Sequence, residues 1–271
     1  MKTNVAFFYG CRSVEHEVSI ISAVQAMRAI DREKYDITPI YVTKDGEMFT
    51  GDALFTIEEY RNIPALLKKC RKVELSRENN QVVMKDEKKG LFGKKPIVID
   101  VAFPVVHGTN CEDGTIQGFF EYLGLPYVGC DIISSAVGMD KAIFKDVLKA
   151  AGLPVLDCIR FRARRYMSDK ESLTNEIKAK IGFPLIVKPI NLGSSVGISK
   201  VDNEAELDEA IMLALSFADN VLVERAVTAI REINCSVLGD MDECKASECE
   251  EPVMTGDILS YKDKYISDSS S

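Results

Sequence analysis

The order of apolar and polar positions in the first part of the chain predicts a strand followed by a helix. Residues 4–9 are apolar enough for a buried strand, Gly10 follows at once, and Ser13 is expected to cap the helix. The apolar positions expected on this helix are Val18, Ile21, Val24 and Ile30. A strand, a glycine and a helix in this order are typical of a doubly wound α/β domain, where ligands bind at the carboxyl ends of strands.

The rest of the first half predicts strands separated by polar connections. A second strand is expected over 37–43 and a hairpin turn at Asp45-Gly46, whereas the remainder of 44–95 is expected to be irregular. Residues 97–106 are almost continuously apolar, as expected of a strand buried on both faces, and a helix is predicted over 116–123.

The second half predicts a β-hairpin set among helices. Its incoming strand covers 184–187 and its outgoing strand 196–201. Helices are expected over 134–151, 170–181 and 203–218, and further strands over 156–161, 221–227 and 232–238. The inward positions of the last helix are Leu207, Ile211, Ala214 and Leu215.

The tip of this hairpin has a composition suited to binding phosphate. Gly193 and Gly197 lack a Cβ and let the backbone approach an anion, and the hydroxyls of Ser194 and Ser195 can donate hydrogen bonds to phosphate oxygens. Lys188, on the incoming strand, can supply positive charge. The tip matches neither a Walker A loop nor a dinucleotide turn, and an ordinary hairpin is the alternative that this segment leaves open.

Three further positions allow both a functional and a structural interpretation. His107 and Asp113 follow the apolar strand 97–106, where such sheets place their sites, but they also suit a hydrogen-bonded histidine and a helix cap. Lys141 falls on the apolar side of helix 134–151, with Val137, Phe144, Leu148 and Ala151. A lysine there either extends to solvent or meets an anion, and the nearby phosphate loop favours the anion.

A carboxylate interrupts the apolar run of residues 221–227. Glu224 could accept hydrogen bonds from an adenine amino group, with backbone groups of Ala226 and Val227 at the ring edge. Glu232 could hold ribose hydroxyls. Either acid is equally compatible with a solvent-facing position on an edge strand.

Composition narrows the class of protein. The 271 residues, 46% hydrophobic and 28% charged, are enough for about two domains. A net charge of −8 argues against a nucleic acid or an anionic membrane as partner, and no apolar run approaches the ~20 residues that a bilayer requires. Eight cysteines without CxxC spacing and two histidines argue against zinc, so we expect a cytoplasmic protein with reduced thiols. The acidic segment 240–252 is expected to be a solvated loop.

Seven motifs in order resemble one family, the D-alanine:D-alanine ligases of the ATP-grasp superfamily. They are EHEVS (15–19), HGTNCEDGTIQG (107–118), YVGC (127–130), GMDK (138–141), KPINLGSSVGISKV (188–201), VLVERAV (221–227) and YKDKY (261–265). The resemblance implies an α/β ATP-grasp fold. Its parts would be an N-terminal doubly wound parallel-sheet domain (1–128), a central α+β subdomain with the glycine-rich loop (129–223) and an incomplete C-terminal α+β subdomain (224–271).

The resemblance also implies a role for each site residue. The ATP-binding positions would be Lys141 and Lys188 at the phosphates, Gly193, Ser194, Ser195, Val196 and Gly197 in the flap, Glu224, Ala226 and Val227 at adenine, and Glu232 at ribose. Segment 228–231 is one residue longer than the family pattern leads us to expect, which weakens the assignment of ribose binding to Glu232. Glu15 would receive the amino group of the first D-alanine, with His107 nearby. Hydrogen bonds would link Glu15, Ser194 and Tyr265, and Lys264 would face the reacting groups.

The chemistry implied by the family is ATP-dependent peptide bond formation. ATP phosphorylates the carboxylate of one D-alanine, and the amine of a second D-alanine attacks the acyl phosphate. Mg²⁺ or Mn²⁺ is expected from the family, but the segments that carry its ligands, similar to RVDFF and NEINTMPG, do not occur here. The chain is therefore expected to be part of a longer protein, inactive by itself, whose partners are two D-alanines, ATP and a second copy in a homodimer.

Three alternatives stay open or are argued against. Tyr265 indicates a dipeptide-forming ligase rather than a D-lactate ligase, but D-serine as the second substrate stays open. From another class, the chain could be an ATP-binding protein without turnover. A dehydrogenase is disfavoured, because the first strand turn, FFYGCRS, has one glycine where a dinucleotide fingerprint needs three.

Overall fold

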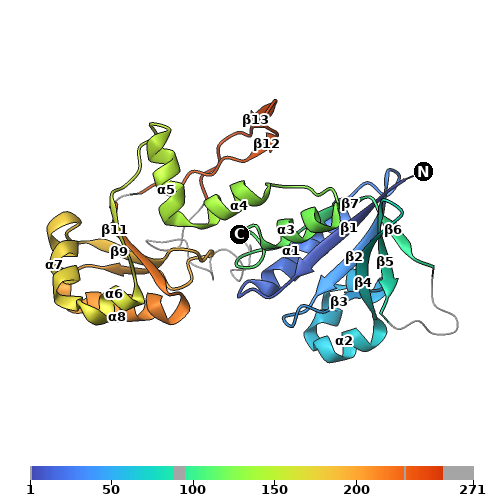
Figure 1. Cartoon of the computed structure of the whole chain (residues 1–271), viewed down its shortest axis with the longest axis horizontal. Helices are drawn as coiled ribbons and strands as arrows, with labels where there is room; N and C mark the ends of the chain where they lie inside the picture. The colour runs from blue at the N-terminus through green and yellow to red at the C-terminus, as the bar shows by residue number, and fades with distance from the viewer. Residues whose placement is uncertain (1, 88–94, 229, 253–271) are drawn as a thin grey trace. The chain divides into compact units, whose positions relative to one another are not determined.

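The structure, a computed structural model, describes residues 2–87, 95–228 and 230–252 and forms two compact units (Figure 1). Unit 1 comprises residues 1–150 together with 191–193, and unit 2 comprises 151–190 together with 194–271. The chain thus returns to unit 1 for three residues at the tip of the predicted hairpin. The three-domain division drawn from the sequence stays a prediction.

Unit 1 is built on a seven-stranded sheet in the order β6-β5-β4-β3-β2-β1-β7. Its strands are β1 (Thr3–Gly10), β2 (Tyr35–Val42), β3 (Met48–Thr50), β4 (Arg71–Glu78), β5 (Gln81–Asp86), β6 (Ile97–Ile99) and β7 (Val101–Pro104). β1 runs parallel to β2 and β7, whereas the pairs from β2 to β6 are antiparallel. The predicted parallel sheet is confirmed for β1, β2 and β7, and antiparallel strands extend it on one side.

Strand β1 supplies the cores on both faces of this sheet. Val5, Phe7 and Tyr9 pack with helix α1 (His16–Ala29), whereas Ala6 and Phe8 pack with helix α3 (Thr115–Leu123). Successive side chains of a strand point to opposite faces, so one apolar strand can join two helical layers. The doubly wound arrangement predicted for this part of the chain therefore holds around β1.

The first helix differs from the prediction in its start and its buried face. It begins at His16, and the hydroxyl of Ser13 accepts from the backbone N–H of Glu15 at 3.1 Å in the turn before the helix. Ile21 is exposed, because the buried face runs through Ile20, Ala23, Val24 and Met27 at helical spacing.

The region 44–95 is more regular than its polarity suggests. The predicted turn at Asp45-Gly46 is confirmed, since Val42 of β2 pairs with Met48 of β3. The expectation that the rest is irregular is wrong: it contains β4 and β5, two 3₁₀ turns, η1 (Asp52–Phe55) and η2 (Ile57–Asn62), and helix α2 (Ile63–Lys69). Charged residues interrupt the apolar positions of β4, whereas β5 buries the three successive residues Val82, Val83 and Met84.

Two predicted elements are each divided by an aspartate. The single strand expected over 97–106 is two strands, β6 and β7, separated by Asp100, whose Oδ2 accepts from the backbone N–H of Asn4 at 2.7 Å. The helix expected over 134–151 is α4 (Ile132–Met139) and α5 (Lys141–Ala150). Asp140 between them has φ −85° and ψ 100° and accepts from the N–H groups of residues 142 and 143. It therefore starts a new helix at Lys141, and the predicted stripe does not continue.

Unit 2 is a four-stranded antiparallel sheet in the order β10-β9-β11-β8, covered by helices. The strands are β8 (Cys158–Arg162), β9 (Leu185–Pro189), β10 (Ser199–Val201) and β11 (Asn220–Arg225), and the helices are α6 (Ala163–Ser168), α7 (Lys170–Lys180) and α8 (Glu204–Phe217). The β9–β10 hairpin, α7 and α8 confirm the predictions, and Leu207, Ile211 and Ala214 are buried as expected.

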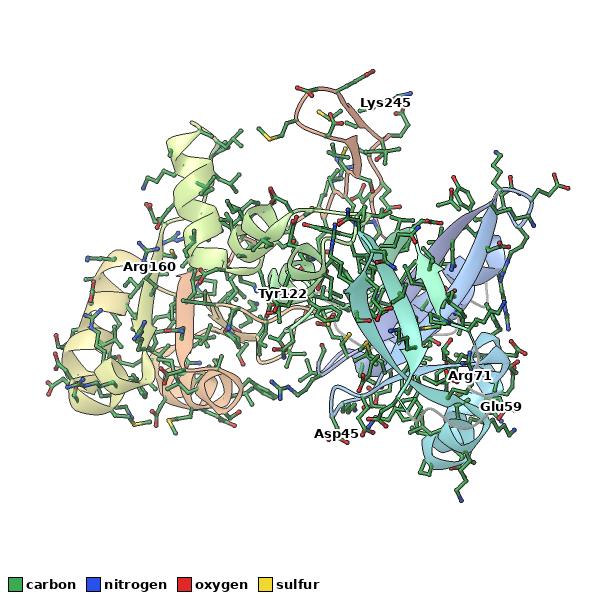
Figure 2. All side chains as sticks on the ribbon, turned by 45° about the vertical axis from the view of Figure 1, so that its right-hand side comes forward. Asp45, Glu59, Arg71, Tyr122, Arg160 and Lys245 are labelled. Atoms are coloured by element: carbon green, nitrogen blue, oxygen red, sulfur yellow. The ribbon has the colours of Figure 1, made fainter. Side chains whose placement is uncertain are left out.

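The strand predicted over 232–238 is wrong in extent. Regular pairing is confined to β12 (Val237–Gly239) and β13 (Cys244–Ala246), a short exposed hairpin on which Figure 2 labels Lys245. Leu238 is 84% exposed, so its apolar character does not reflect a core. The acidic segment is exposed as predicted, although part of it forms a strand. Among the helices that the structure describes, none is long and apolar enough to cross a bilayer.

Candidate functional site

A tight turn at the carboxyl end of β1 places the EHEVS motif. Gly10 has φ +88°, and a Cβ there would lie 2.5 Å from the carbonyl oxygen of Val42. The next residue, Cys11, also has a positive φ, 67°, and its N–H donates to the same carbonyl at 2.8 Å. Only glycine fits the first of these positions, so the turn is fixed against β2 and delivers Glu15 to the end of the sheet.

The side chain of Glu15 is buried where two other motifs of unit 1 approach it. The residue is 2% exposed. A Cβ on Gly108 would lie 2.4 Å from Glu15 Oε2 and 2.5 Å from the hydroxyl of Ser13. A Cβ on Gly193 would lie 3.1 Å from the same carboxylate oxygen. Two glycines from distant motifs thus flank one carboxylate, and Gly108 was not singled out from the sequence although it lies within HGTNCEDG.

The loop that follows β7 is held by its own acidic side chains. Asp113 accepts from the backbone N–H of Asn110 at 2.7 Å and of Thr115 at 3.1 Å, and Glu112 accepts from that of Gly108 at 2.7 Å. These bonds support the structural interpretation of Asp113. His107 Nε2 lies 3.1 Å from the hydroxyl of Ser22 on α1, so this histidine joins the loop to the helix that starts beside Glu15.

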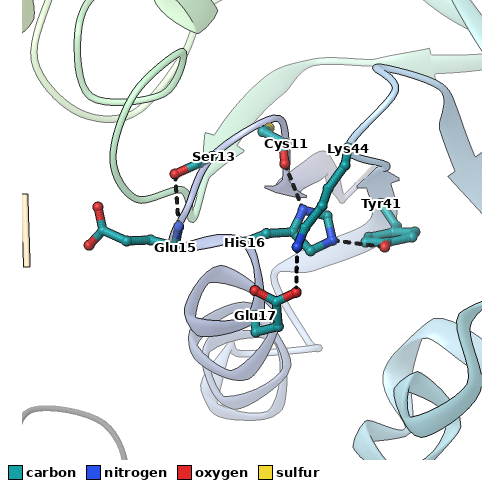
Figure 3. A network of polar contacts seen from close by, with 7 residues as sticks. All are labelled: Cys11, Ser13, Glu15, His16, Glu17, Tyr41 and Lys44. Carbon is teal, nitrogen blue, oxygen red and sulfur yellow. Dashed lines mark hydrogen bonds and ion pairs between the residues drawn. The ribbon is translucent and has the colours of Figure 1, made fainter. Parts of the chain in front are cut away.

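His16 points away from Glu15 into a separate polar network (Figure 3). Its Nδ1 lies 2.6 Å from the carbonyl oxygen of Cys11, and its Nε2 lies 2.9 Å from the hydroxyl of Tyr41. A carbonyl only accepts, so Nδ1 carries a proton, and in the neutral ring Nε2 accepts from Tyr41. Burial, together with the charge of Glu17, raises the pKa of Tyr41 to about 12, which keeps its hydroxyl protonated as the donor.

Lys141 ties the hairpin tip to unit 1. Its ammonium group donates to the carbonyl oxygen of Leu192, which belongs to the three-residue segment 191–193. The bond therefore holds the backbone next to Gly193, the residue that lies against Glu15. In the structure, this lysine therefore contacts a backbone carbonyl directly before the predicted phosphate loop 193–197.

The turn of the loop has backbone geometry that few residues adopt. Ser194 and Ser195 both lie in the left-handed region, with φ 48° and 59°, and Gly197 has φ +71°. A Cβ on Gly197 would lie 2.9 Å from both the Phe217 and the Pro189 side chains. Val196 is half-buried. Consecutive positive φ values turn the backbone sharply, and such turns can direct several N–H groups toward an anion.

Lys188 and Glu224 form an ion pair on one face of the unit 2 sheet. Lys188 on β9 pairs with Leu222 of β11, which makes Glu224 its diagonal neighbour on the same face. Their side chains are 17% and 9% exposed. Glu224 therefore belongs to a central strand and is buried, so the solvent-facing alternative considered from the sequence is wrong.

The remaining predicted positions are spread over several environments. Ala226 is buried, and its N–H donates to the carbonyl of Pro184 at 3.0 Å, whereas Val227 is exposed. Glu232 is half-buried outside any strand. Lys264 and Tyr265 lie outside the described residues. Within the part of the chain that the structure describes, no group of three or more histidine, cysteine, aspartate or glutamate side chains is arranged to hold a metal ion.

Comparison with protein families agrees with the order of these motifs. The model described as "D-ala D-ala ligase N-terminus" matches residues 4–130, and the one described as "D-ala D-ala ligase C-terminus" matches residues 147–271.

Individual relatives match along nearly the whole chain. D-alanine--D-alanine ligase of Thermosipho melanesiensis is 41% identical over 265 residues, covering 97% of this chain and 70% of that protein. The enzyme of the same name from Acetivibrio thermocellus is 39% identical, covering 99% of this chain and 73% of its own length.

Solved structures of related ligases are also similar to this chain. VanG D-Ala:D-Ser ligase from Enterococcus faecalis superposes with a TM-score of 0.78 at 34% identity, covering 93% of this chain and 70% of that one. The D-alanine-D-alanine ligase from Coxiella burnetii has a TM-score of 0.79 at 32% identity, covering 92% and 68%.

Proposed function

The chain belongs to the D-alanine–D-alanine ligase family, and from this premise we propose that it joins two D-alanine molecules at the expense of ATP. In this reaction the carboxylate of one D-alanine takes the γ-phosphoryl group, with release of ADP. The amine of the second D-alanine then attacks the acyl carbon, and phosphate leaves. No protein nucleophile is required, so the protein acts by positioning and by charge stabilisation.

The position of Glu15 is the observation that carries this proposal. A carboxylate that is 2% exposed lies between the glycines of two motifs and suits an ammonium group presented by a small ligand. In a site removed from water, the ammonium group of a bound D-alanine would interact favourably with this carboxylate. We propose that His107, next to Gly108 in the sequence, lines the same position.

The residues of the hairpin fit the phosphates of ATP in chemical type. The left-handed turn at Ser194 and Ser195 offers hydroxyls and N–H groups, and Lys141 and Lys188 offer positive charge. On binding, Lys188 would exchange part of its contact with Glu224 for a phosphate oxygen. Glu224 would then be available to the adenine amino group beside the backbone of Ala226 and Val227, with Glu232 at the ribose.

The metal expected from the family does not find ligands among the described residues. No arrangement of three acidic, histidine or cysteine side chains is present there, so no step is assigned to Mg²⁺ or Mn²⁺ on these residues. When bound with ATP, such a metal would neutralise phosphate charge.

Binding and turnover can be measured separately. Calorimetry with ATP and with D-alanine on the 271-residue chain tests the site, and dipeptide formation by this chain and by any longer protein that contains it tests the reaction. We expect Glu15→Gln to weaken D-alanine binding at least tenfold, whereas Glu33→Gln, an exposed acid of unit 1, leaves it unchanged. ATP hydrolysis without dipeptide, or no ATP binding by either protein, would contradict the proposal.

D-serine is the second acceptor to test, because the VanG D-Ala:D-Ser ligase is among the structural relatives. Phosphate release with D-alanine, D-serine and D-lactate as acceptors separates the possibilities. We expect D-alanine to give the highest kcat/KM, since the curated relatives are named D-alanine--D-alanine ligases. The product would serve peptidoglycan precursor synthesis, and the use of ATP favours a cytoplasmic enzyme, which we propose to be a homodimer.

A further inference from the structure

A cavity lies beside the first turn of α1, on the side opposite the Glu15 carboxylate, and is separate from that carboxylate. It has a volume of 610 Å³ and lies wholly within unit 1, among α1, β2, the β2–β3 turn, η2 and α2. This volume is within the range of about 300–1,000 Å³ that small-molecule sites occupy. His16 lines it, while Glu15 points the opposite way (Figure 3). No step of the ligase reaction uses this space.

The walls of the cavity are apolar and aromatic. Ile20 and Ile21 contribute from α1, and Tyr41 contributes from β2. The opposite wall is made by Ile57, Tyr60, Ile63 and Leu67. The rings of Tyr41 and Tyr60 meet edge to face, with centroids 5.6 Å apart and an angle of 84° between their planes. The two rings form an aromatic corner of the cavity that suits a flat or branched apolar group. The face of a tyrosine ring also attracts a cation.

The rim of the cavity is charged, and the balance is negative. Four acidic side chains, Glu17, Asp45, Glu47 and Glu58, face two basic ones, Lys44 and Arg61, which leaves a net charge of −2. Glu17 pairs with Lys44 at 2.7 Å, and Glu47 pairs with Lys72 at 2.9 Å. Among the described residues, Asp45 and Glu58 have no ion pair within 4.0 Å. Within the described part of the chain, these two acids at the mouth of the cavity form no ion pair, and the two basic residues of the rim leave it with an excess of acids.

We propose that this cavity is a binding site for a small amphipathic cation, a molecule with an apolar ring or branched body and one ammonium or guanidinium group. The body fills the space between the isoleucines and the tyrosine corner, and the cationic group lies at the rim near Asp45 and Glu58. A carboxylate ligand of the same shape would meet four acids. The inference does not rest on the ligase reaction, because it concerns a different cavity and is tested by binding.

Three probes of one shape test the proposal on the 271-residue chain. They are phenethylamine, 2-phenylethanol and 3-phenylpropionate, titrated by ligand-observed NMR. We expect saturable binding of the amine, about fivefold or more weaker binding of the alcohol, and the weakest binding of the carboxylate, since a cation at an exposed acidic rim gains up to about fivefold per charge pair. Equal binding of the amine and the alcohol, or no saturable binding of the amine, would overturn the proposal.

Two variants locate the bound amine. Ile21→Trp fills the cavity from a residue that is 44% exposed, and we expect it to reduce amine binding at least tenfold; Met212→Trp, on α8 and 45% exposed, is the matched control and leaves binding unchanged. Glu58→Gln should weaken the amine about threefold and leave the alcohol unaffected, whereas Glu33→Gln should change neither. Full amine binding by Ile21→Trp would place the amine elsewhere and refute the assignment.

Discussion

At the scale of single residues, the site depends on glycines that permit close approach. Gly108 combines φ +79° with the position of its missing Cβ, 2.4 Å from Glu15 Oε2. Both the backbone strain and the clash would penalise a side chain there. The pattern of apolar residues gives no sign of this contact, because it joins two motifs 93 positions apart in the sequence.

We expect Gly108→Ala to lower the free energy of unfolding by about 2–4 kcal/mol and to weaken D-alanine binding. Gly46→Ala is the matched control, since Gly46 has φ +85° but no atom within 4 Å of its Cβ position. It should cost only the backbone strain, about 1–2 kcal/mol. Equal losses in the free energy of unfolding of the two variants, measured with urea, would mean that the contact with Glu15 does not contribute to stability.

The Lys188–Glu224 pair gives a second prediction at this scale. Because both side chains are largely removed from water, removing one charge takes away an opposite charge that the other side chain contacts directly. We expect Lys188→Met to lower the free energy of unfolding by about 3 kcal/mol and the double variant Lys188→Met, Glu224→Leu to recover at least about half of that loss. Additive losses in a double-mutant cycle would show that the two charges are not coupled.

At the scale of elements, apolar periodicity was sufficient to predict a helix or strand wherever the same pattern continued along the whole element. The strand β1, the β9–β10 hairpin and the helices α7 and α8 follow from it directly. It failed at Asp140 and Asp100, where a side chain accepts backbone N–H groups and divides an otherwise continuous pattern. Such breaks depend on a side-chain rotamer and not on hydropathy.

In the candidate site too, local backbone features could be predicted from the sequence, whereas contacts between distant segments could not. The positive φ values at the hairpin tip agree with its glycine and serine content. The Lys141 contact with Leu192 and the burial of Glu224 on a central strand depend on strand order and on contacts between distant segments. Both positions stand out in the sequence as charged residues in apolar patterns, but the structural alternatives stay open for them until the resemblance to family motifs is added.

The helices of unit 2 are joined by an acid whose protonation should affect stability. Asp208 on α8 accepts from the hydroxyl of Tyr166 on α6 and pairs with Lys170 on α7 at 2.6 Å. The hydrogen bond from Lys170 and then that from Tyr166 lower the pKa of Asp208 below its ordinary value. A lowered folded-state pKa means that the stabilisation is present above the unfolded value and is lost as the pH falls through the folded one.

We therefore expect Asp208→Asn to reduce stability at pH 6 to 7 and to converge with the unsubstituted chain below about pH 3. Thermal unfolding of both proteins between pH 2.5 and 7 measures the difference. Asp202→Asn, an exposed acid before α8 that pairs with Lys200 at 3.3 Å, is the control and should show a smaller pH-dependent difference. A constant difference between the Asp208→Asn and unsubstituted proteins across the range would exclude a contribution from protonation.

At the scale of the whole molecule, the two compact units have separate cores. Leu66 belongs to the core around β1 and α1 in unit 1, and Leu173 belongs to the core under the unit 2 sheet; both are fully buried. Replacing a buried leucine by alanine costs about 2–5 kcal/mol through lost burial and the cavity that remains. If each unit unfolds as its own cooperative structure, each substitution should affect one transition.

We expect calorimetry of the 271-residue chain to require two transitions, with Leu66→Ala lowering the Tm of one and Leu173→Ala lowering the Tm of the other. ATP would raise mainly the transition that Leu173→Ala lowers, because a ligand stabilises the structure that binds it and most of the proposed ATP-binding residues belong to unit 2. A single transition shifted equally by both variants would show that the units unfold together.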